Sequence, residues 1–200
     1  MKELSLNILD IAENSVKAGA DTVRITLTEE NNLLTIRIED NGCGMKEDFL
    51  RSVTDPFTTT RTTRNVGMGI PLFKLAAEQT GGSFSVTSRH EEDYPEDHGT
   101  VTQASFRQDH LDYTPLGDIV STVTVLIQGS PDIRWVFEHR IGEAEVSLDT
   151  DELREVLGDV PLNNIEVINW ITGYLKEQYQ EIGYHSTEKN FASYRKGTTT

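Results

Sequence analysis

At 200 residues the chain is long enough for one generous domain or two small ones, and its 36% hydrophobic and 26% charged residues are typical of a globular protein. The formal net charge of −15 argues against a nucleic-acid-binding surface, because phosphate backbones require clustered Lys and Arg. Cys43 is the only cysteine, so no internal disulfide can form and a reducing compartment is favoured. Neither a secretory pattern nor a run of membrane-spanning length is visible, so we expect a cytoplasmic protein that contacts no membrane.

The first predicted element is a helix through residues 2–18 that stops at Gly19. Its period separates a packing side from a polar side, with Leu4, Ile8, Ile11, Ala12 and Ser15 on the first and Asp10, Asn14 and Lys17 on the second. Two alternating segments, residues 22–28 and 33–40, then predict a hairpin-like strand pair. The period of two places Asp40 on the core-facing side of the second strand.

A short helix near residue 47, a polar loop over 54–69 and a helix after Gly69 come next, followed by two strands on either side of an acidic connection. Pro115 and Gly117 then mark a soft boundary, with a first domain over 1–112 and a small α+β module over 116–185. Within that module we expect a helix, a hairpin about Gly142 and two further helices, with Trp135 and Trp170 in its core, the alternative being an interface. Residues 186–200 are expected to form a polar tail.

Four glycine-bearing loops and one polar helix face occur in a specific order. The chain reads DIAENSVK at 10–17, DNGCGM at 40–45, DPFTTTR at 55–61 and GMGIPL at 67–72, then GG at 81–82 and GT at 99–100. This succession resembles the ATP-binding module of the GHKL superfamily, which includes gyrase-type topoisomerases, large heat-shock chaperones, sensor histidine kinases and MutL-type mismatch-repair ATPases. The resemblance covers about residues 1–108. It implies an α+β fold of Bergerat type, a sandwich of a mixed sheet with helices on one face.

The resemblance implies that Asp40 accepts a hydrogen bond from the exocyclic amine of adenine. A buried carboxylate requires such donors, although Asp40 could instead cap the turn that follows it. Gly42 and Gly44 lack side chains where a flat ring must approach the backbone, and Met45 either packs on that ring or fills the core. The hydroxyl of Thr100 would join the hydrogen bonds around the aspartate, the alternative being an ordinary strand threonine.

On the first helix, Asn14 matches the asparagine that ligates Mg²⁺ in the family, and its amide oxygen suits a hard cation that bridges phosphates. Lys17, one turn later, is expected to contact phosphate, the alternative being a solvated surface lysine. Asp10 matches the position where chaperones and mismatch-repair ATPases carry a glutamate that activates water. The shorter side chain of Asp favours slow hydrolysis over fast hydrolysis.

By the same resemblance, the polar loop is the lid over the triphosphate, and its sequence is close to the phenylalanine box of histidine kinases. Phe57 would anchor the lid on apolar surface, while Arg61 and Arg64 would meet the phosphate charge. Gly67 and Gly69 lie just before a helix whose first N–H groups can receive phosphate oxygens.

Three functions fit these residues. The first is an ATP- and Mg²⁺-dependent protein kinase that phosphorylates a separate partner, similar to the anti-sigma-factor serine kinases. Autophosphorylation is not expected, because no helix with a phosphoacceptor histidine precedes the ATP module. The second is an ATPase switch with Asp10 as the base, and the third is a nucleotide-binding scaffold without turnover. The module over 116–185 is expected to dock a partner or to form a homodimer.

Overall fold

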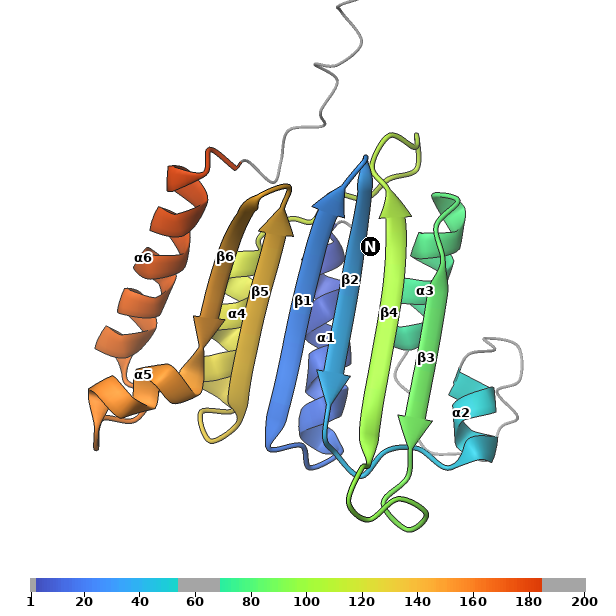
Figure 1. Cartoon of the computed structure of the whole chain (residues 1–200), viewed down its shortest axis with the longest axis horizontal. Helices are drawn as coiled ribbons and strands as arrows, with labels where there is room; N and C mark the ends of the chain where they lie inside the picture. The colour runs from blue at the N-terminus through green and yellow to red at the C-terminus, as the bar shows by residue number, and fades with distance from the viewer. Residues whose placement is uncertain (1–2, 54–68, 185–200) are drawn as a thin grey trace, which may run out of the picture.

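The computed structural model describes residues 3–53 and 69–184. Within them, six strands form one mixed sheet in the order β3-β4-β2-β1-β5-β6 (Figure 1). The strands are β1 (Thr22–Glu30), β2 (Leu33–Asp40), β3 (Phe84–Arg89), β4 (Gly99–Arg107), β5 (Arg134–Ile141) and β6 (Ala144–Asp149). The helices are α1 (Leu4–Lys17), α2 (Glu47–Val53), α3 (Gly69–Gln79), α4 (Ile119–Gly129), α5 (Thr150–Leu157) and α6 (Ile165–Glu181).

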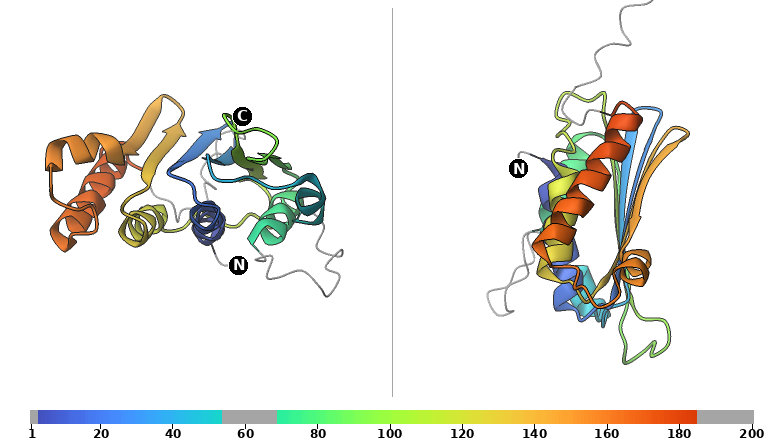
Figure 2. Two further views of the ribbon diagram at one scale, coloured as in Figure 1. Left: turned by 90° about the horizontal axis from the view of Figure 1, so that it is seen from below. Right: turned by 90° about the vertical axis from the view of Figure 1, so that its left-hand side faces the viewer.

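Three helices cover one face of the sheet. Figure 2 shows α4, α1 and α3 side by side on that face, with α1 in the middle, and α6 lies next to α4. All neighbouring strands are antiparallel except β1 and β5, which run parallel. The expected α+β architecture, a mixed sheet with helices on one face, is confirmed.

The β1–β2 hairpin shows how local sequence fixes this arrangement. Asn31 and Asn32 adopt φ values of 53° and 60°, a left-handed conformation that asparagine tolerates better than most residues. The resulting two-residue turn sets a register in which Ile25 faces Ile38. Because side chains alternate, this register turns the apolar residues of both strands toward the helices and leaves Asp40 at the end of β2, beside α1.

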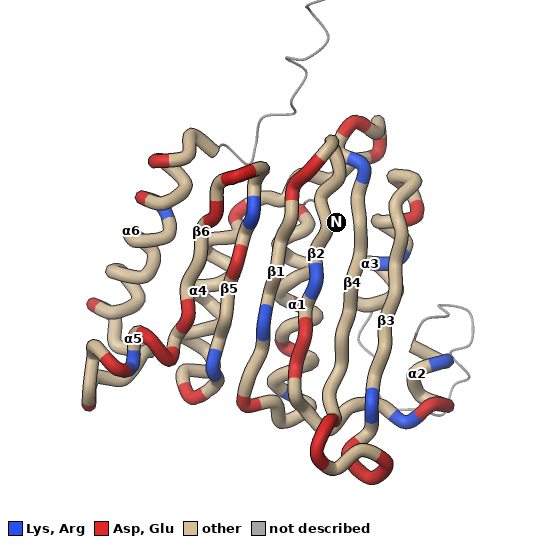
Figure 3. Tube along the Cα trace, in the orientation of Figure 1, with Lys and Arg blue, Asp and Glu red and all other residues tan. Residues whose placement is uncertain are grey.

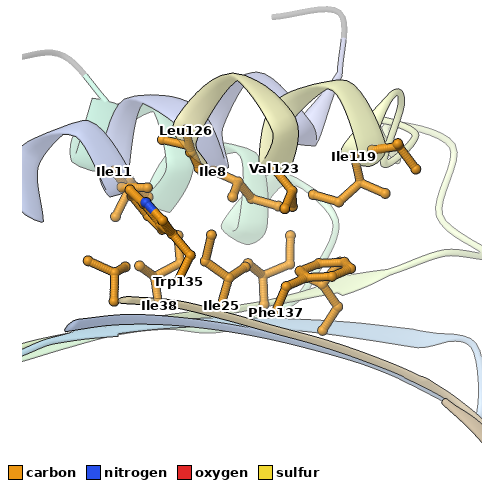
Figure 4. Close-up of a cluster of buried hydrophobic side chains, with 14 of the residues drawn as sticks. Ile8, Ile11, Ile25, Ile38, Ile119, Val123, Leu126, Trp135 and Phe137 are labelled. Carbon is orange, nitrogen blue, oxygen red and sulfur yellow. The ribbon is translucent and has the colours of Figure 1, made fainter. Parts of the chain in front are cut away.

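The core fills the space between the sheet and the helices. Figure 4 shows Ile8 and Ile11 of α1 and residues of α4 above Ile25, Ile38, Trp135 and Phe137 of the sheet. The strands on both sides of the expected boundary thus contribute to one hydrophobic cluster. The sheet is continuous as well, since β5 pairs with β1 along its whole length. That the segments 1–112 and 116–185 are separate domains stays a prediction.

Helix α6 covers the outer edge of β6. The side-chain amide of Gln178 accepts from the backbone N–H of Ser147 at 3.1 Å and donates to its carbonyl oxygen at 3.1 Å. This pair of bonds imitates a neighbouring strand and occupies an edge that could otherwise pair with another chain. No helix among residues 3–53 and 69–184 is both long enough and apolar enough to span a bilayer.

The two tryptophans have different environments. Trp135 is buried in the core as expected, and its indole N–H donates to the carbonyl of Ser130 at 3.0 Å. The expectation of a core position is wrong for Trp170, since this residue is 53% exposed. The reason is the phase of α6, which turns Ile171 and Leu175 toward the core and places Trp170 on an adjacent stripe.

Candidate functional site

The carboxylate of Asp40 is held in place from two sides. The hydroxyl of Ser15, on α1, donates to Asp40 Oδ2 at 2.7 Å, and the backbone N–H of Gly42 donates to Oδ1 at 3.0 Å. Asp40 is half-buried, whereas Ser15 is only 3% exposed. These bonds fix the orientation of the acid group and tie the end of β2 to the helix that carries Asn14.

The loop after Asp40 packs against the end of α1 without room for side chains at its glycines. A Cβ added to Gly42 would lie 2.8 Å from Cβ of Ala18, and one added to Gly44 would lie 2.0 Å from the carbonyl oxygen of Arg89. Gly44 also has a φ of 69°. The protein's own atoms therefore require both glycines, and their contact with a nucleotide base stays a prediction.

A second hydroxyl organises the other side of the loop. Ser88 Oγ, on β3, lies 2.9 Å from Thr100 Oγ1, donates to the carbonyl of Gly99 at 3.0 Å and accepts from the backbone N–H of Met45 at 2.7 Å. Thr100 faces Asp40 in the β2–β4 register. Its hydroxyl thus joins a network centred on Ser88, and Met45 packs at the rim of the core.

The polar face of α1 lies beside Asp40, because Ser15 and Asn14 are consecutive on the helix. Asn14 is half-buried, while Asp10 and Lys17 are exposed. The ammonium group of Lys17 lies 3.5 Å from the carboxylate of Glu13, an ion pair with both side chains mostly in water. The expected roles of Asp10, Asn14 and Lys17 toward metal and phosphate stay predictions, and the helix places all three on one side of α1.

Helix α3 begins directly against Asp10. A Cβ added to Gly69, the first residue of α3, would lie 3.1 Å from Cβ of Asp10. The start of α3 thus adjoins the polar face of α1, as a shared phosphate site requires. Phe57, Arg61, Arg64 and Gly67, expected in the lid, lie outside the described residues.

Two residues of the site, Ser15 and Ser88, belong to none of the motifs that the sequence offers. The helical period places Ser15 on the packing side of α1, where it does lie, and a polar side chain among Ile8 and Ile11 is the signal that could have revealed its role. Ser88 carried no such signal, because a serine in a half-exposed strand is ordinary. Its role follows only from the pairing of β3 with β4.

Comparison with known proteins shows which family the chain belongs to. The chain is 31% identical over 93 residues to the sensor protein SrrB of Staphylococcus aureus, a match that covers 44% of this chain and 16% of that protein. The chain therefore spans well under a fifth of that relative's length. Among solved structures, the N-terminal domain of a DNA repair protein is similar with a TM-score of 0.52, at 15% identity over 74% of this chain and 53% of that one.

The MutL ATPase domain of Aquifex aeolicus, solved with ADP, is similar with a TM-score of 0.50, at 13% identity over 78% of this chain and 69% of that one. At such identities these structures establish a shared fold. Residues 2–110 match the model of one family along more than half of the chain. The chain belongs to the family of histidine kinase-, DNA gyrase B-, and HSP90-like ATPases, the GHKL superfamily.

Proposed function

We propose that this chain binds ATP with Mg²⁺ and transfers the γ-phosphoryl group to a partner protein in the cytoplasm. The observation that carries the binding step is the fixed carboxylate of Asp40, held by Ser15 and Gly42 beside the polar face of α1. Each oxygen of a carboxylate can accept more than one hydrogen bond, so Asp40 keeps acceptor capacity for the exocyclic amine of adenine.

The other proposed contacts are to the metal and the phosphates, and they lie along α1 away from the adenine. Asn14 offers a single neutral oxygen to Mg²⁺, an ion that usually keeps several waters and is held largely by phosphate oxygens. This donor suits a metal that arrives with the nucleotide. Lys17, Arg61 and Arg64 would balance phosphate charge, and the first N–H groups of α3 would receive phosphate oxygens next to Gly69.

Titration calorimetry with ATP and GTP tests the binding step. Guanine carries a carbonyl oxygen where adenine carries its amine, so the full chain should bind ATP and reject GTP. Asp40→Asn keeps the shape of the side chain but presents a donor to the base, and we expect ATP affinity to fall at least about tenfold, or 1.4 kcal/mol. The matched control is Glu39→Gln on the other face of β2, where the carboxylate pairs with Arg37 at 3.0 Å. Unchanged affinity in Asp40→Asn would refute the assignment.

Phosphoryl transfer to a protein is supported by sequence likeness to a sensor protein and by the kinase-like residues of the loop that contains Phe57. In this reaction a nucleophilic side chain of the acceptor attacks the γ-phosphorus, and the bond to the β,γ-bridging oxygen breaks. ADP leaves, and the proton of the acceptor passes to a base. Asp10 precedes Asn14 by one helical turn on the same side of α1 and is the proposed base, whereas the neighbouring Glu13 is ion-paired with Lys17.

A second candidate function is a slow ATPase switch, favoured by the close packing of Asp10 against the first residue of α3. If Asp10 is the base, any movement of α3 on binding of the triphosphate would change the position of its carboxylate. Water would then replace the protein acceptor, and the bound nucleotide would set the conformation that partners recognise.

Labelled ATP separates the two functions. In the purified full chain, release of free phosphate that disappears in Asp10→Asn supports the switch. Transfer of label to one protein added from the source organism supports the kinase. Glu13→Gln is the matched control, since it removes a neighbouring carboxylate on the exposed side of the same helix. Nucleotide binding without either product would leave the scaffold alternative and refute both reactions.

A further inference from the structure

A groove runs between α5, α6 and one face of β1, β5 and β6, and we name it the α5–α6 groove. Its volume is about 410 Å³, and the residues that matter for its chemistry are Trp170, Tyr174, Glu152, Glu138, Glu145 and Arg24. Arg24 of β1 lines one edge of the groove and faces Glu39 in the β1–β2 register, so the groove reaches the strand next to β2 (Figure 1). Because side chains alternate along the strands, Arg24 and Asp40 project from opposite faces of the sheet, so the groove and the candidate nucleotide site lie on different faces.

One wall of the groove is a pair of exposed aromatic rings. Trp170 and Tyr174 lie one turn apart on α6 and are stacked, with ring centroids 5.0 Å apart and an angle of 9° between the planes. The side chains are 53% and 39% exposed. Two large rings left in water form an apolar surface of the kind that anchors protein partners, since Trp and Tyr are enriched among residues that dominate binding energy.

The remaining walls carry excess negative charge. Four carboxylates line the groove against the single guanidinium of Arg24, which pairs with Glu138 at 2.6 Å. Arg134 and Arg140, from outside the lining, hold Asp149 and Glu145. Within residues 3–53 and 69–184, Glu152 makes no hydrogen bond or ion pair, although the hydrogen bond from Arg134 to Asp149 and the charges of Asp149, Asp151 and Glu152 together raise the pKa of Arg134. Figure 3 shows the acidic residues of α5 and β6 gathered at this end of the sheet.

An aromatic wall beside an unpaired carboxylate suits one kind of side chain best. The planar guanidinium of arginine stacks on aromatic faces and can donate two parallel hydrogen bonds to a carboxylate. A phosphate-bearing ligand would instead be repelled, both locally and by the net charge of −15. The edge of β6 is already occupied by Gln178, so addition of a strand there is blocked.

We propose that the α5–α6 groove docks an arginine side chain from an exposed segment of a partner protein. The guanidinium packs against the Trp170–Tyr174 pair and bonds to Glu152. A partner held there would leave the polar face of α1 open, so docking and nucleotide binding can occur together. The proposal stands on the groove alone and does not require a particular reaction at Asp40.

The test uses the full chain and the peptide acetyl-Gly-Gly-Arg-Gly-Gly-amide, followed by NMR of the two tryptophan indole N–H groups. We expect the Trp170 signal to shift with peptide and the signal of buried Trp135 to stay, which gives an internal reference. The analogue with citrulline in place of arginine keeps the shape without the charge. It should bind at least about tenfold more weakly.

Matched variants locate the effect. Trp170→Ala and Glu152→Gln should each weaken peptide binding several-fold. Glu155→Gln should not, although Glu155 is an exposed carboxylate on α5, the helix that carries Glu152. Equal losses in the Glu152 and Glu155 variants would mean general attraction to an acidic surface and would overturn the proposal. Equal binding of the citrulline peptide, or no shift of Trp170 at millimolar peptide, would also overturn it.

Two other occupants would appear as distinct results. If sedimentation shows a dimer that Trp170→Ala converts to a monomer, a second copy of the chain fills the groove and the proposal is wrong. If a chain that ends at Tyr184 binds the peptide much more tightly than the full chain, residues 185–200, which carry Lys189, Arg195 and Lys196, are the occupant. Equal affinity of the two chains and a sedimentation coefficient unaffected by Trp170→Ala support a separate partner.

Discussion

At the scale of single residues, the site depends on a hydroxyl placed inside an apolar stripe. Ser15 lies on the packing side of α1 with Ile8 and Ile11, at a position where a larger apolar side chain would add to the core. Its bond to Asp40 instead orients the carboxylate and brings Asn14 close to it. The residue therefore serves the geometry of the site more than the stability of the fold.

Ser15→Ala tests whether Ser15 contributes more to the geometry of the site than to the stability of the fold. The variant removes one hydrogen bond to a charged group, and we expect ATP affinity to fall about tenfold while the free energy of unfolding changes by only about 1 kcal/mol. Ser5→Ala is the control, since Ser5 is equally buried on α1 but its hydroxyl contacts Glu3 at 3.4 Å. Calorimetry and urea unfolding of both variants give the comparison. The idea fails if Ser15→Ala binds ATP as tightly as the parent chain.

Asn7 is a different kind of buried polar residue on the same helix. Its side chain is 1% exposed, and in the described part of the chain neither its amide nitrogen nor its oxygen has a hydrogen-bond partner. Such a group costs roughly 1–3 kcal/mol in desolvation. Asn7→Leu, similar in size and apolar, should therefore raise the free energy of unfolding by about 1 kcal/mol in a denaturant titration. A less stable variant would show that the amide has a partner in solution.

At the scale of elements, a buried polar cluster joins the end of β1 to β5 and to the end of α6. The carboxylate of Glu29 accepts from the hydroxyl of Tyr184 at 2.6 Å and from the amide of Gln108 at 2.8 Å. His139, fully buried on β5, lies 3.2 Å from it and 2.8 Å from the hydroxyl of Tyr179. The cluster thus fixes the C-terminal end of α6 to the central strand of the sheet.

The charge of Glu29 makes this link dependent on pH. Burial by itself raises the pKa of Glu29, but contacts with His139, Tyr184 and Gln108 outweigh burial and hold the pKa below its ordinary value of 4.5. The folded state therefore prefers the charged carboxylate. Its contribution to stability is complete above about pH 4.5 and is lost as the pH falls through the lower, folded-state pKa.

Glu29→Gln should show this loss directly. At pH 7 we expect the variant to be less stable by roughly 1–3 kcal/mol, because a charged acceptor is replaced by a neutral amide. Below the folded-state pKa of Glu29 the difference should shrink, since the parent carboxyl is then neutral too. Urea unfolding at several pH values measures both. Glu30→Gln, an exposed neighbour on β1, should show neither effect, and a gap that stays constant with pH would exclude this account.

Local pattern predicted the elements well because short-range physics decides them. Alternating residues and the Asn31–Asn32 turn specify the β1–β2 hairpin, and the helical period specifies the two sides of α1. The parallel pairing of β5 with β1 could not be predicted, since it joins residues more than a hundred positions apart. For the same reason the contacts of Ser88 followed only from the pairing of β3 with β4.

At the scale of the whole molecule, the residues expected to bind ATP lie in the first segment, while the core that supports them is shared. Trp135 and Phe137 of β5 pack with Ile8, Ile11 and Ile25 of the first segment (Figure 4). Losing one large aromatic side chain from a core costs about 3–5 kcal/mol, and whole domains are stable by only about 5–15 kcal/mol. Removal of everything after residue 112 would expose far more apolar surface than one such side chain.

A chain ending at residue 112 should therefore be unfolded or aggregated, whereas a chain cut after folding should stay assembled. Introducing a protease site in the exposed stretch at Leu111 allows the cut without removing any residue. We expect the two cleaved pieces to migrate together in gel filtration and to keep ATP affinity, because β5 remains paired with β1 and the core remains buried. Pieces that separate, with a soluble first segment that still binds ATP, would establish two independent domains instead. The cut chain thus tests whether the first segment needs the second segment for its fold or is an independent domain.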